Sequence, residues 1–166
     1  MLKTFYPDEY VDSTYIIPFE KLYTEGYRGV IFDIDNTLVP HGAPADDRAK
    51  ALFAKLKELG YQACLLSNNK EPRVKMFNKD VQVNYIFKAN KPSVKNYQKA
   101  MELMGTDKSN TVFVGDQLFT DVWGAKRTGI RNYLVKPIHP KEEIQIVIKR
   151  VFEKIVLFFY KRQRRK

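Results

Sequence analysis

The chain has 166 residues, 44% of them hydrophobic, which is enough for one domain with a sizeable buried core. Its longest apolar run near the C-terminus, residues 155–160, is far shorter than the ~20 residues of a membrane-spanning helix, and the acids and proline at residues 7–9 do not fit a signal peptide. The net charge of +10 favours anionic partners: phosphorylated small molecules, nucleic acid or acidic lipid surfaces.

The first part of the chain leads into a pair of closely spaced acids. Residues 1–26 carry many aromatic side chains and are expected to form an N-terminal arm packed on the domain, with a short helix near residues 19–23. The apolar run at residues 30–32 predicts a buried strand, and Asp33 and Asp35 come directly after it. Asn36 and Thr37 are turn residues that would bring both acids to one centre.

Apolar periodicity and helix stops place the remaining elements. Helices are predicted over residues 45–59, 72–77, 91–104 and 118–127, and strands over 63–66, 83–87, 111–114 and 132–135, with a last helix after residue 140. Cys64, the only cysteine, lies in such a strand and is expected to be a buried hydrophobe in a reducing cytoplasm. Alternating strands and helices predict a three-layer, Rossmann-like α/β domain with a parallel sheet of about five strands.

Every strong polar candidate follows a predicted strand. The set comprises Asp33, Asp35, Ser67, Asn68, Lys91 and Asp116, with Asp121 one helical turn further on. Ligands of open α/β sheets bind at the carboxyl ends of the strands, so these side chains are expected at one edge. Neighbouring acids repel one another unless a cation lies between them, and carboxylate oxygens suit Mg²⁺.

Several of these residues also have plainer interpretations. Ser67 is a possible helix cap, Lys91 a possible solvated charge, and Asp121 a possible first-turn acid that a helix dipole favours. His41 and His139 are typical of surface loops, and no role is assigned to either.

The set resembles the four motifs of the haloacid dehalogenase superfamily of phosphohydrolases. The matching stretches are Asp33-Ile34-Asp35-Asn36-Thr37-Leu38, the strand-end Ser67, Lys91-Pro92, and residues 115–121 with the pattern G-D-Q-x-x-T-D. Within it the chain is similar to the YqeG-type branch of subclass IIIA, which is related to mitochondrial phosphatidylglycerophosphate phosphatases; residues 6–11 share this likeness. The resemblance implies the strand order 5-4-1-2-3. Because the segments between the motifs are short, it also implies no cap domain.

The resemblance and general phosphoryl-transfer chemistry imply a role for each residue. Asp33 would attack phosphorus and form an aspartyl-phosphate, while Asp35 would act as general acid and then base. Mg²⁺ would be bound by Asp33, by the main-chain carbonyl of Asp35 and by Asp116. The phosphate would be held by Ser67, Asn68 and Lys91, with Thr37 and Asp121 in support.

The chain is expected to form a single domain spanning residues 1–166, with the N-terminal arm at 1–26 and the catalytic core at 28–135. The last segment, 141–166, is expected to be an amphipathic helix with a basic tail. Its apolar stripe is formed by Ile144, Ile148, Val151, Ile155 and Phe158, and five of the last six residues are basic. Such a helix can lie in the headgroup region of an anionic membrane. Alternatively it covers the sheet or a dimer partner, with the first half of the stripe packed on the domain.

The substrate stays open at this point. A capless phosphatase at the inner face of a membrane would suit a lipid headgroup phosphate such as phosphatidylglycerophosphate. The alternatives are a phosphatase of a soluble phosphometabolite or nucleotide, and a nucleic-acid- or ribosome-associated Mg²⁺-binding protein without hydrolase activity. A homo-oligomer, in which a neighbouring subunit forms the lid, is also compatible with the sequence.

Overall fold

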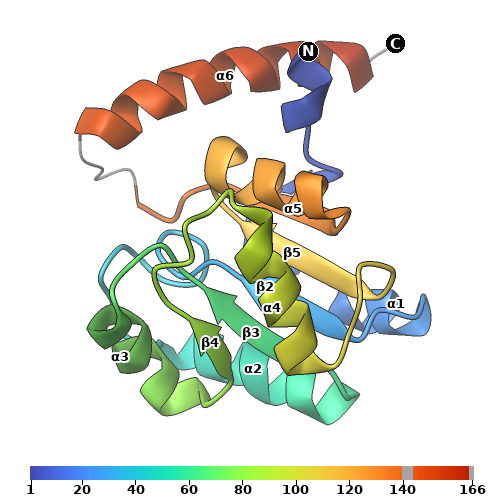
Figure 1. Ribbon diagram of the computed structural model, residues 1–166, viewed down its shortest axis with the longest axis vertical. Coiled ribbons are helices and arrows are strands. Elements are labelled where there is room, and N and C mark those ends of the chain that lie inside the picture. The colour runs from blue at the N-terminus through green and yellow to red at the C-terminus, as the bar shows by residue number, and fades with distance from the viewer. Residues whose placement is uncertain (140–143, 165–166) are drawn as a thin grey trace.

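A parallel six-stranded sheet organises the molecule (Figure 1). The computed structural model describes residues 1–139 and 144–164, and of residues 144–147 only the backbone. The strands are β1 Glu9–Val11, β2 Gly29–Phe32, β3 Gln62–Leu66, β4 Asn84–Ile86, β5 Thr111–Gly115 and β6 Arg131–Val135. Their order is β1-β6-β5-β2-β3-β4, so the five predicted strands and their predicted order are confirmed. The three-residue β1, which adds an edge strand, was not predicted.

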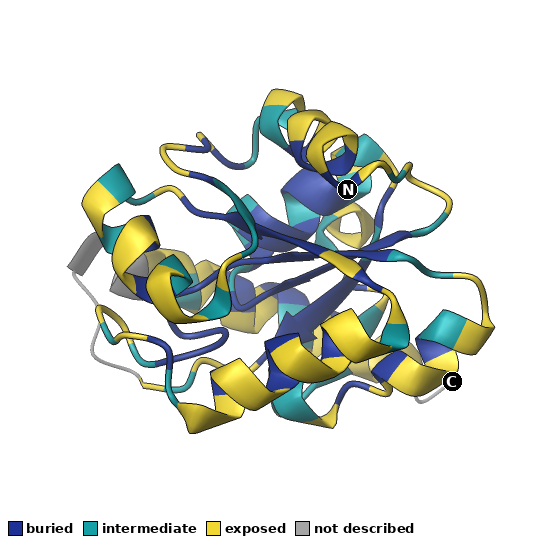
Figure 2. Cartoon of the chain, turned by 90° about the horizontal axis from the view of Figure 1, so that it is seen from below, coloured by how far each residue is buried: buried dark blue, intermediate teal, exposed yellow. Residues whose placement is uncertain are grey.

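Helices cover both faces of the sheet, and the buried strands form the middle layer (Figure 2). On one face lie α1 Phe19–Thr24, α2 Asp47–Leu59 and α3 Glu71–Val81; on the other lie α4 Val94–Met104 and α5 Trp123–Thr128. Only α2 separates β2 from β3 and only α3 separates β3 from β4, which leaves no cap domain at either position. Three short helices are η1 Leu2–Phe5, η2 Thr14–Ile16 and η3 Leu118–Val122.

The helix predicted over residues 118–127 is divided in two. Its first part is the π-helical η3, and α5 begins only at Trp123. The hydroxyl of Tyr97 donates to the main-chain carbonyl of Thr120 over 2.8 Å, which anchors this wider turn to α4. Sequence periodicity does not distinguish a π-helical turn from an α-helical one, whereas the turn determines where Asp121 points.

The N-terminal arm is tied to the sheet by β1 and by a reciprocal side-chain contact. β1 pairs in parallel with β6, with Tyr10 opposite Leu134. The carboxylate of Asp8 accepts from the main-chain N–H and the side-chain amide of Asn132 at 3.0 and 2.9 Å, and the Asp8 N–H donates to the Asn132 side chain. Asn132 is fully buried, so this pairing replaces hydrogen bonds with water.

The last helix, α6 Ile144–Arg164, lies across η1 and η3 (Figure 1). The prediction that the first half of its apolar stripe packs on the domain is wrong, because Ile148 and Val151 are 56% and 54% exposed. Arg150 and Glu153 bond to the segment that follows β5, and Val156 packs beside Leu118. Residues 140–143 and 165–166 of the predicted helix and tail, and the side chain of Ile144, lie outside the described residues.

None of the described helices combines the length with the apolar character needed to span a bilayer.

Replacing Asn132 by Ala is expected to lower the free energy of unfolding by about 1–3 kcal/mol, because the buried Asn132 side chain no longer donates to the Asp8 carboxylate or accepts from the Asp8 N–H. Urea denaturation measures the change. Lys136→Ala, which removes an exposed ion pair with Asp12, serves as the control and is expected to cost less than about 1 kcal/mol. Equal stability of Asn132→Ala and the unaltered chain would contradict this role of Asn132 in holding the arm.

Candidate active site

The predicted polar residues lie at the carboxyl ends of the strands. Asp33 follows β2, Ser67 follows β3 and Asp116 follows β5, while Lys91 lies in the loop between β4 and α4. The ammonium Nζ of Lys91 lies 2.8 Å from Asp33 Oδ1 and 2.7 Å from Asp121 Oδ1. Lys91 therefore links the end of β2 to the segment that follows β5.

Three carboxylates are buried together at this edge. Asp33, Asp116 and Asp121 each offer one oxygen, and these oxygens lie within 4.8 Å of one another. Thr37 Oγ1 lies 3.2 Å from Asp33 Oδ2 and 3.3 Å from Asp116 Oδ1. Burial raises the pKa of Asp33 to about 6. Burial and the two neighbouring carboxylates also hold the pKa of Asp116 well above its usual range.

Two side-chain cations bond to these acids. Burial alone would lower the pKa of Lys91, but the carboxylates of Asp121 and Asp33 hold it above its usual value. Arg150, from α6, forms an ion pair with Asp116. Among the described residues, the three carboxylates therefore exceed the two cations bonded to them by one negative charge when all five groups are ionised.

The approach of Asp121 to β5 requires glycine at position 115. A Cβ atom there would lie 2.5 Å from Asp121 Oδ2, so any larger residue would displace this carboxylate. Asp121 Oδ2 also accepts from the Gln117 N–H at 3.1 Å. The contact of Asp121 with Lys91 has the geometry expected of a supporting residue, and its part in a reaction stays a prediction.

Asp35 lies at the same edge, but its carboxylate is outside the three-acid group. The backbone turns immediately after it, where Asn36 has a φ of 61°. Arg73 donates through Nε and Nη2 to Asp35 Oδ1 at 3.1 and 2.8 Å. The side-chain amide of Asn69 donates to Asp35 Oδ2 at 3.0 Å, and the Gly42 N–H donates to Asp35 Oδ1 at 2.8 Å. Burial would raise the pKa of Asp35, but the hydrogen bonds from Gly42 and Arg73 hold it below its usual value.

Ser67 and Asn68 make local contacts that their predicted phosphate-binding roles did not include. Ser67 Oγ is buried and accepts from the Asn69 N–H at 3.1 Å, as a turn-capping residue does. The Asn68 amide bonds to the main chain of Lys91, accepting at 2.7 Å and donating at 3.3 Å. The Asn68 side chain therefore positions the Lys91 loop, and its contact with phosphate stays a prediction.

The two histidines lie at the rim. His41 Nδ1 is 3.9 Å from Asp35 Oδ1 on a side chain that is 62% exposed. His139 is exposed, and its main-chain N–H donates to Asn36 at 3.1 Å.

Sequence reasoning did not find Arg73 or Arg150. Arg73 lies at the start of α3, directly after the Ser67 loop, and this position was a usable signal. Arg150 had no such signal. It lies between Lys149 and Lys154 on what the sequence presents as the polar face of an amphipathic helix.

The chemistry of the buried acids fits a divalent metal ion. Asp33, Asp116 and Asp121 supply oxygen ligands only, which hard cations such as Mg²⁺ prefer. The excess negative charge is a second reason, because burying unpaired charge is costly.

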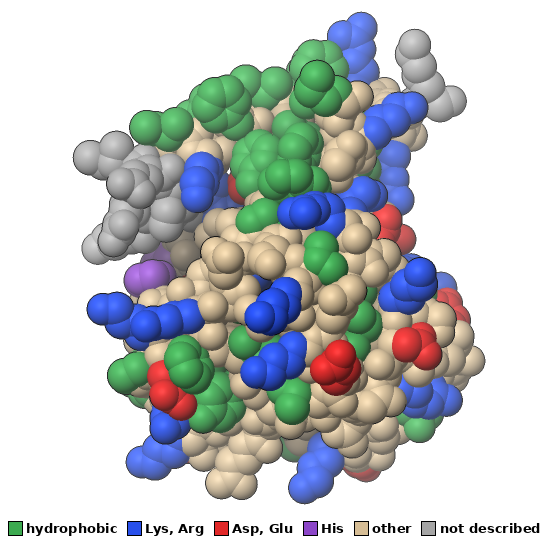
Figure 3. All heavy atoms as spheres, viewed as in Figure 1, with side chains coloured by type: hydrophobic (Ala, Val, Ile, Leu, Met, Phe, Trp, Pro, Cys, Tyr) green, Lys and Arg blue, Asp and Glu red, His purple; other side chains and the backbone are tan. Residues whose placement is uncertain are grey.

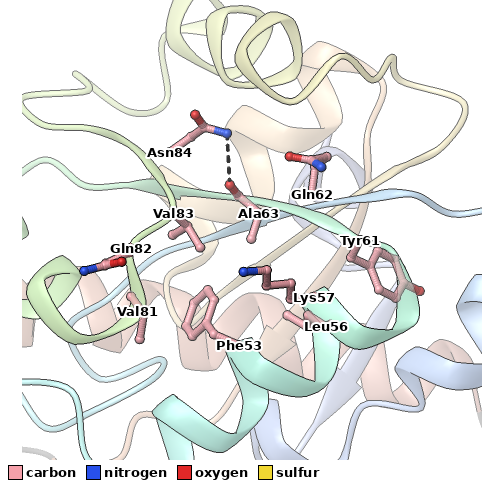
Figure 4. Close-up of a pocket in the computed structure, with 10 residues that line it drawn as sticks. All are labelled: Phe53, Leu56, Lys57, Tyr61, Gln62, Ala63, Val81, Gln82, Val83 and Asn84. Atoms are coloured by element: carbon pink, nitrogen blue, oxygen red, sulfur yellow. Dashed lines mark hydrogen bonds between the residues drawn. The ribbon is translucent and has the colours of Figure 1, made fainter.

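The structure also contains a pocket of about 480 Å³, which lies at the opposite edge of the sheet (Figure 4). Its lining includes Leu56 near the end of α2, Gln62 at the start of β3 and Asn84 at the start of β4. It therefore opens at the amino ends of these strands, away from the acids, and is not part of the candidate site.

Comparison with known proteins gives consistent results. The family model of haloacid dehalogenase-like hydrolases matches residues 41–129. The chain is 38% identical to "Probable phosphatase YqeG" of Bacillus subtilis, over 98% of this chain and 96% of that protein. It is 27% identical to "Phosphatidylglycerophosphate phosphatase 1, chloroplastic/mitochondrial" of Arabidopsis thaliana, over 90% of this chain but only 45% of that protein.

A solved structure shares the fold at low sequence identity. The 3-deoxy-D-manno-octulosonate 8-phosphate phosphatase of Moraxella catarrhalis, in complex with magnesium ion, phosphate ion and KDO, is 13% identical. It aligns with a TM-score of 0.55 over 72% of this chain and 75% of that one. Together with the strand order, the buried acids and the full-length relative, these matches show that the chain belongs to the haloacid dehalogenase-like hydrolase family and is a phosphatase.

Proposed function

We propose that the protein is a Mg²⁺-dependent phosphomonoester hydrolase that uses Asp33 as its nucleophile. The observation that carries the proposal is the group of three buried acids held by Lys91 at the end of β2. Within it, Asp33 has the most exposed side chain, at 12%, against 0% for Asp116 and 1% for Asp121. Asp33 is therefore the acid that a substrate can reach.

Mg²⁺ is the proposed ion. The carboxylates of Asp33 and Asp116 and the main-chain carbonyl of Asp35 would hold it, as the resemblance implies. When bound, Mg²⁺ neutralises charge on the transferring phosphate and so lets an anionic nucleophile approach. The magnesium and phosphate ions in the Moraxella relative support this choice.

The protein groups then divide the reaction into two displacements. An oxygen of Asp33 forms a bond to phosphorus while the bond from phosphorus to the alkoxide breaks, and Asp35 gives that alkoxide its proton. Asp35 next accepts a proton from water, whose oxygen attacks phosphorus and releases inorganic phosphate and free Asp33. Lys91 and Ser67 would hold the phosphoryl oxygens throughout.

Arg73 bears on the acid step. Its two hydrogen bonds keep Asp35 ionised and fixed in the substrate-free protein. Asp35 must therefore gain its proton after the ion pair with Arg73 loosens. An incoming phosphate dianion would favour this change, because it competes for the guanidinium and raises the pKa of Asp35.

A lipid headgroup phosphate is the proposed substrate class. The described residues form no cap over the site, and the similarity to the Arabidopsis phosphatidylglycerophosphate phosphatase supports this choice. The outer face of α6 carries exposed apolar side chains, which are Ile148, Val151, Phe152, Ile155, Phe158 and Phe159 (Figure 3). The same helix carries Lys149, Lys154 and Lys161, which are also exposed and complement an anionic membrane. We therefore propose that the protein acts in the cytoplasm, at the inner face of the membrane.

Replacing Asp33 by Asn is expected to reduce phosphate release from an aryl phosphate by about 10³-fold or more, because the nucleophilic oxygen is lost. A colorimetric phosphate assay with Mg²⁺ measures the rate. Asp80→Asn, which makes the same change at an exposed position on α3, is expected to keep full activity. An Asp33→Asn variant as active as Asp80→Asn would contradict the proposal.

Mg²⁺ is expected to raise the midpoint of thermal unfolding more at pH 7.5 than at pH 5. The pKa of Asp33 is about 6, so at pH 5 most Asp33 carboxyls carry a proton that competes with the ion. Differential scanning calorimetry measures the shift, with NaCl of matched ionic strength as the control. A shift of equal size at both pH values would show that Mg²⁺ acts elsewhere.

The double substitution Phe152→Ser and Phe158→Ser is expected to weaken binding to phosphatidylglycerol vesicles by about tenfold or more, because buried apolar area drives interfacial binding. Sedimentation of the vesicles measures binding, and turnover of an aryl phosphate should not change. Phe87→Ser, at a partly exposed position near β4, is the control. Failure of the unaltered chain to bind would favour a soluble substrate, and dimerisation in its place would identify the face as a subunit interface.

A further inference from the structure

The orientation of α6 is unusual for an amphipathic helix. Its broad apolar face points outward, whereas Arg150 and Glu153 point toward the domain, with side-chain exposures of 16% and 7%. If hydrophobic burial alone determined the orientation, the apolar face of α6 would point toward the domain. A polar requirement of the domain beneath it therefore contributes, together with the buried Val156 and Tyr160, to which face of α6 docks.

The requirement lies in the segment after β5. Arg150 donates through Nη1 to the main-chain carbonyl of Asp116 and through Nη2 to its Oδ2. Arg150 Nη1 also lies 2.9 Å from Glu153 Oε2, and Glu153 Oε1 accepts from the Leu118 N–H at 2.9 Å. The Arg150 guanidinium thus hydrogen-bonds to both the backbone and the side chain of Asp116, and the Glu153 carboxylate holds the guanidinium in this orientation.

The two oxygens of Asp116 face different partners. Oδ2 accepts from Arg150, whereas Oδ1 lies 3.3 Å from Thr37 Oγ1, which in turn lies 3.2 Å from Asp33 Oδ2. The guanidinium therefore occupies the Asp116 oxygen that is not bonded to Thr37, the side chain that links Asp116 to Asp33. The oxygen on the side of the three-acid group stays available to an ion.

We propose that Arg150 is a positioning residue for the metal site, which fixes Asp116 so that Oδ1 faces the ion. Docking of α6 and binding of the ion then stabilise each other, although α6 supplies no ligand. The inference rests on the proposed function, because it assumes that Asp116 binds Mg²⁺. The four strand-end motifs include no residue of α6, and the match to the family model ends at residue 129, before α6 begins.

Positioning differs measurably from competition with the ion and from simple anchoring of the helix. If Arg150 competed with the ion for Asp116, its removal would strengthen Mg²⁺ binding, because a nearby positive charge would be lost. If Arg150 only held the helix in place, any change that weakens α6 packing would weaken Mg²⁺ binding equally. Positioning requires the planar, two-donor guanidinium, which lysine does not reproduce.

Titration calorimetry of the metal-free, full-length chain with MgCl₂ tests the inference. Arg150→Met and Arg150→Lys are each expected to weaken Mg²⁺ binding by about 10-fold or more, as outer-shell substitutions do. Lys149→Met removes a charge from the exposed side of α6, and Val156→Ala removes a buried apolar contact. Both are expected to bind Mg²⁺ as the unaltered chain does, although Val156→Ala unfolds at a lower temperature.

Three results would overturn the inference. They are unchanged or tighter binding in Arg150→Met, unchanged binding in Arg150→Lys, and equally weakened binding in Val156→Ala. Should Arg150→Met not fold, Arg150→Lys and Val156→Ala still distinguish positioning from anchoring and from competition. A lack of Mg²⁺ binding by the unaltered chain would instead remove the proposed function itself.

Hydrogen exchange provides a second readout that does not depend on turnover. Mg²⁺ is expected to slow exchange of the α6 amides between residues 150 and 160 in the unaltered chain and to have no such effect in Arg150→Met. Equal protection by Mg²⁺ in both proteins would contradict the inference, because the coupling between α6 and the site would then not depend on Arg150.

Discussion

The burial of three carboxylates at the ends of β2 and β5 is the constraint on which the site depends. One carboxylate oxygen from each of Asp33, Asp116 and Asp121 lies within 4.8 Å of the other two. All three residues are buried, so water cannot solvate them fully. Such a group persists only if positive charge faces it. Lys91 from the β4–α4 loop and Arg150 from α6 supply that charge, so segments distant in sequence are drawn to one point.

The parallel sheet explains why these segments meet. In such a sheet every strand delivers its following residue to the same edge, so acids after β2 and β5 become neighbours although about eighty residues separate them. The position of each acid after a strand was visible in the sequence, and with it the central polar set, whereas the strand order followed from the family resemblance. Particular residues therefore made both the fold and most of the site predictable.

The features that the sequence did not reveal are contacts between particular side chains. The clamp of Arg73 on Asp35 and the ion pair of Arg150 with Asp116 join residues that share no periodic pattern. The edge strand β1 is too short to be distinguished from a loop, and its attachment combines backbone pairing with β6 and the contact of Asp8 with the buried Asn132. The sequence left the orientation of α6 open between a membrane-facing stripe and one packed on the domain, because amphipathicity considers only apolar burial and does not reveal the contact of Arg150 with Asp116.

The residue that becomes phosphorylated during turnover decides whether Asp33 is the nucleophile. Acid quenching during turnover of an aryl phosphate, followed by borohydride reduction and peptide mass spectrometry, converts an aspartyl-phosphate into homoserine at the residue that carried it. Homoserine is expected at position 33 and at no other acid, because Asp33 has the most exposed side chain of the three acids, next to Lys91. Two results would contradict the proposed role of Asp33. They are homoserine at position 35 or 116, and unmodified aspartate at positions 33, 35 and 116 during rapid turnover.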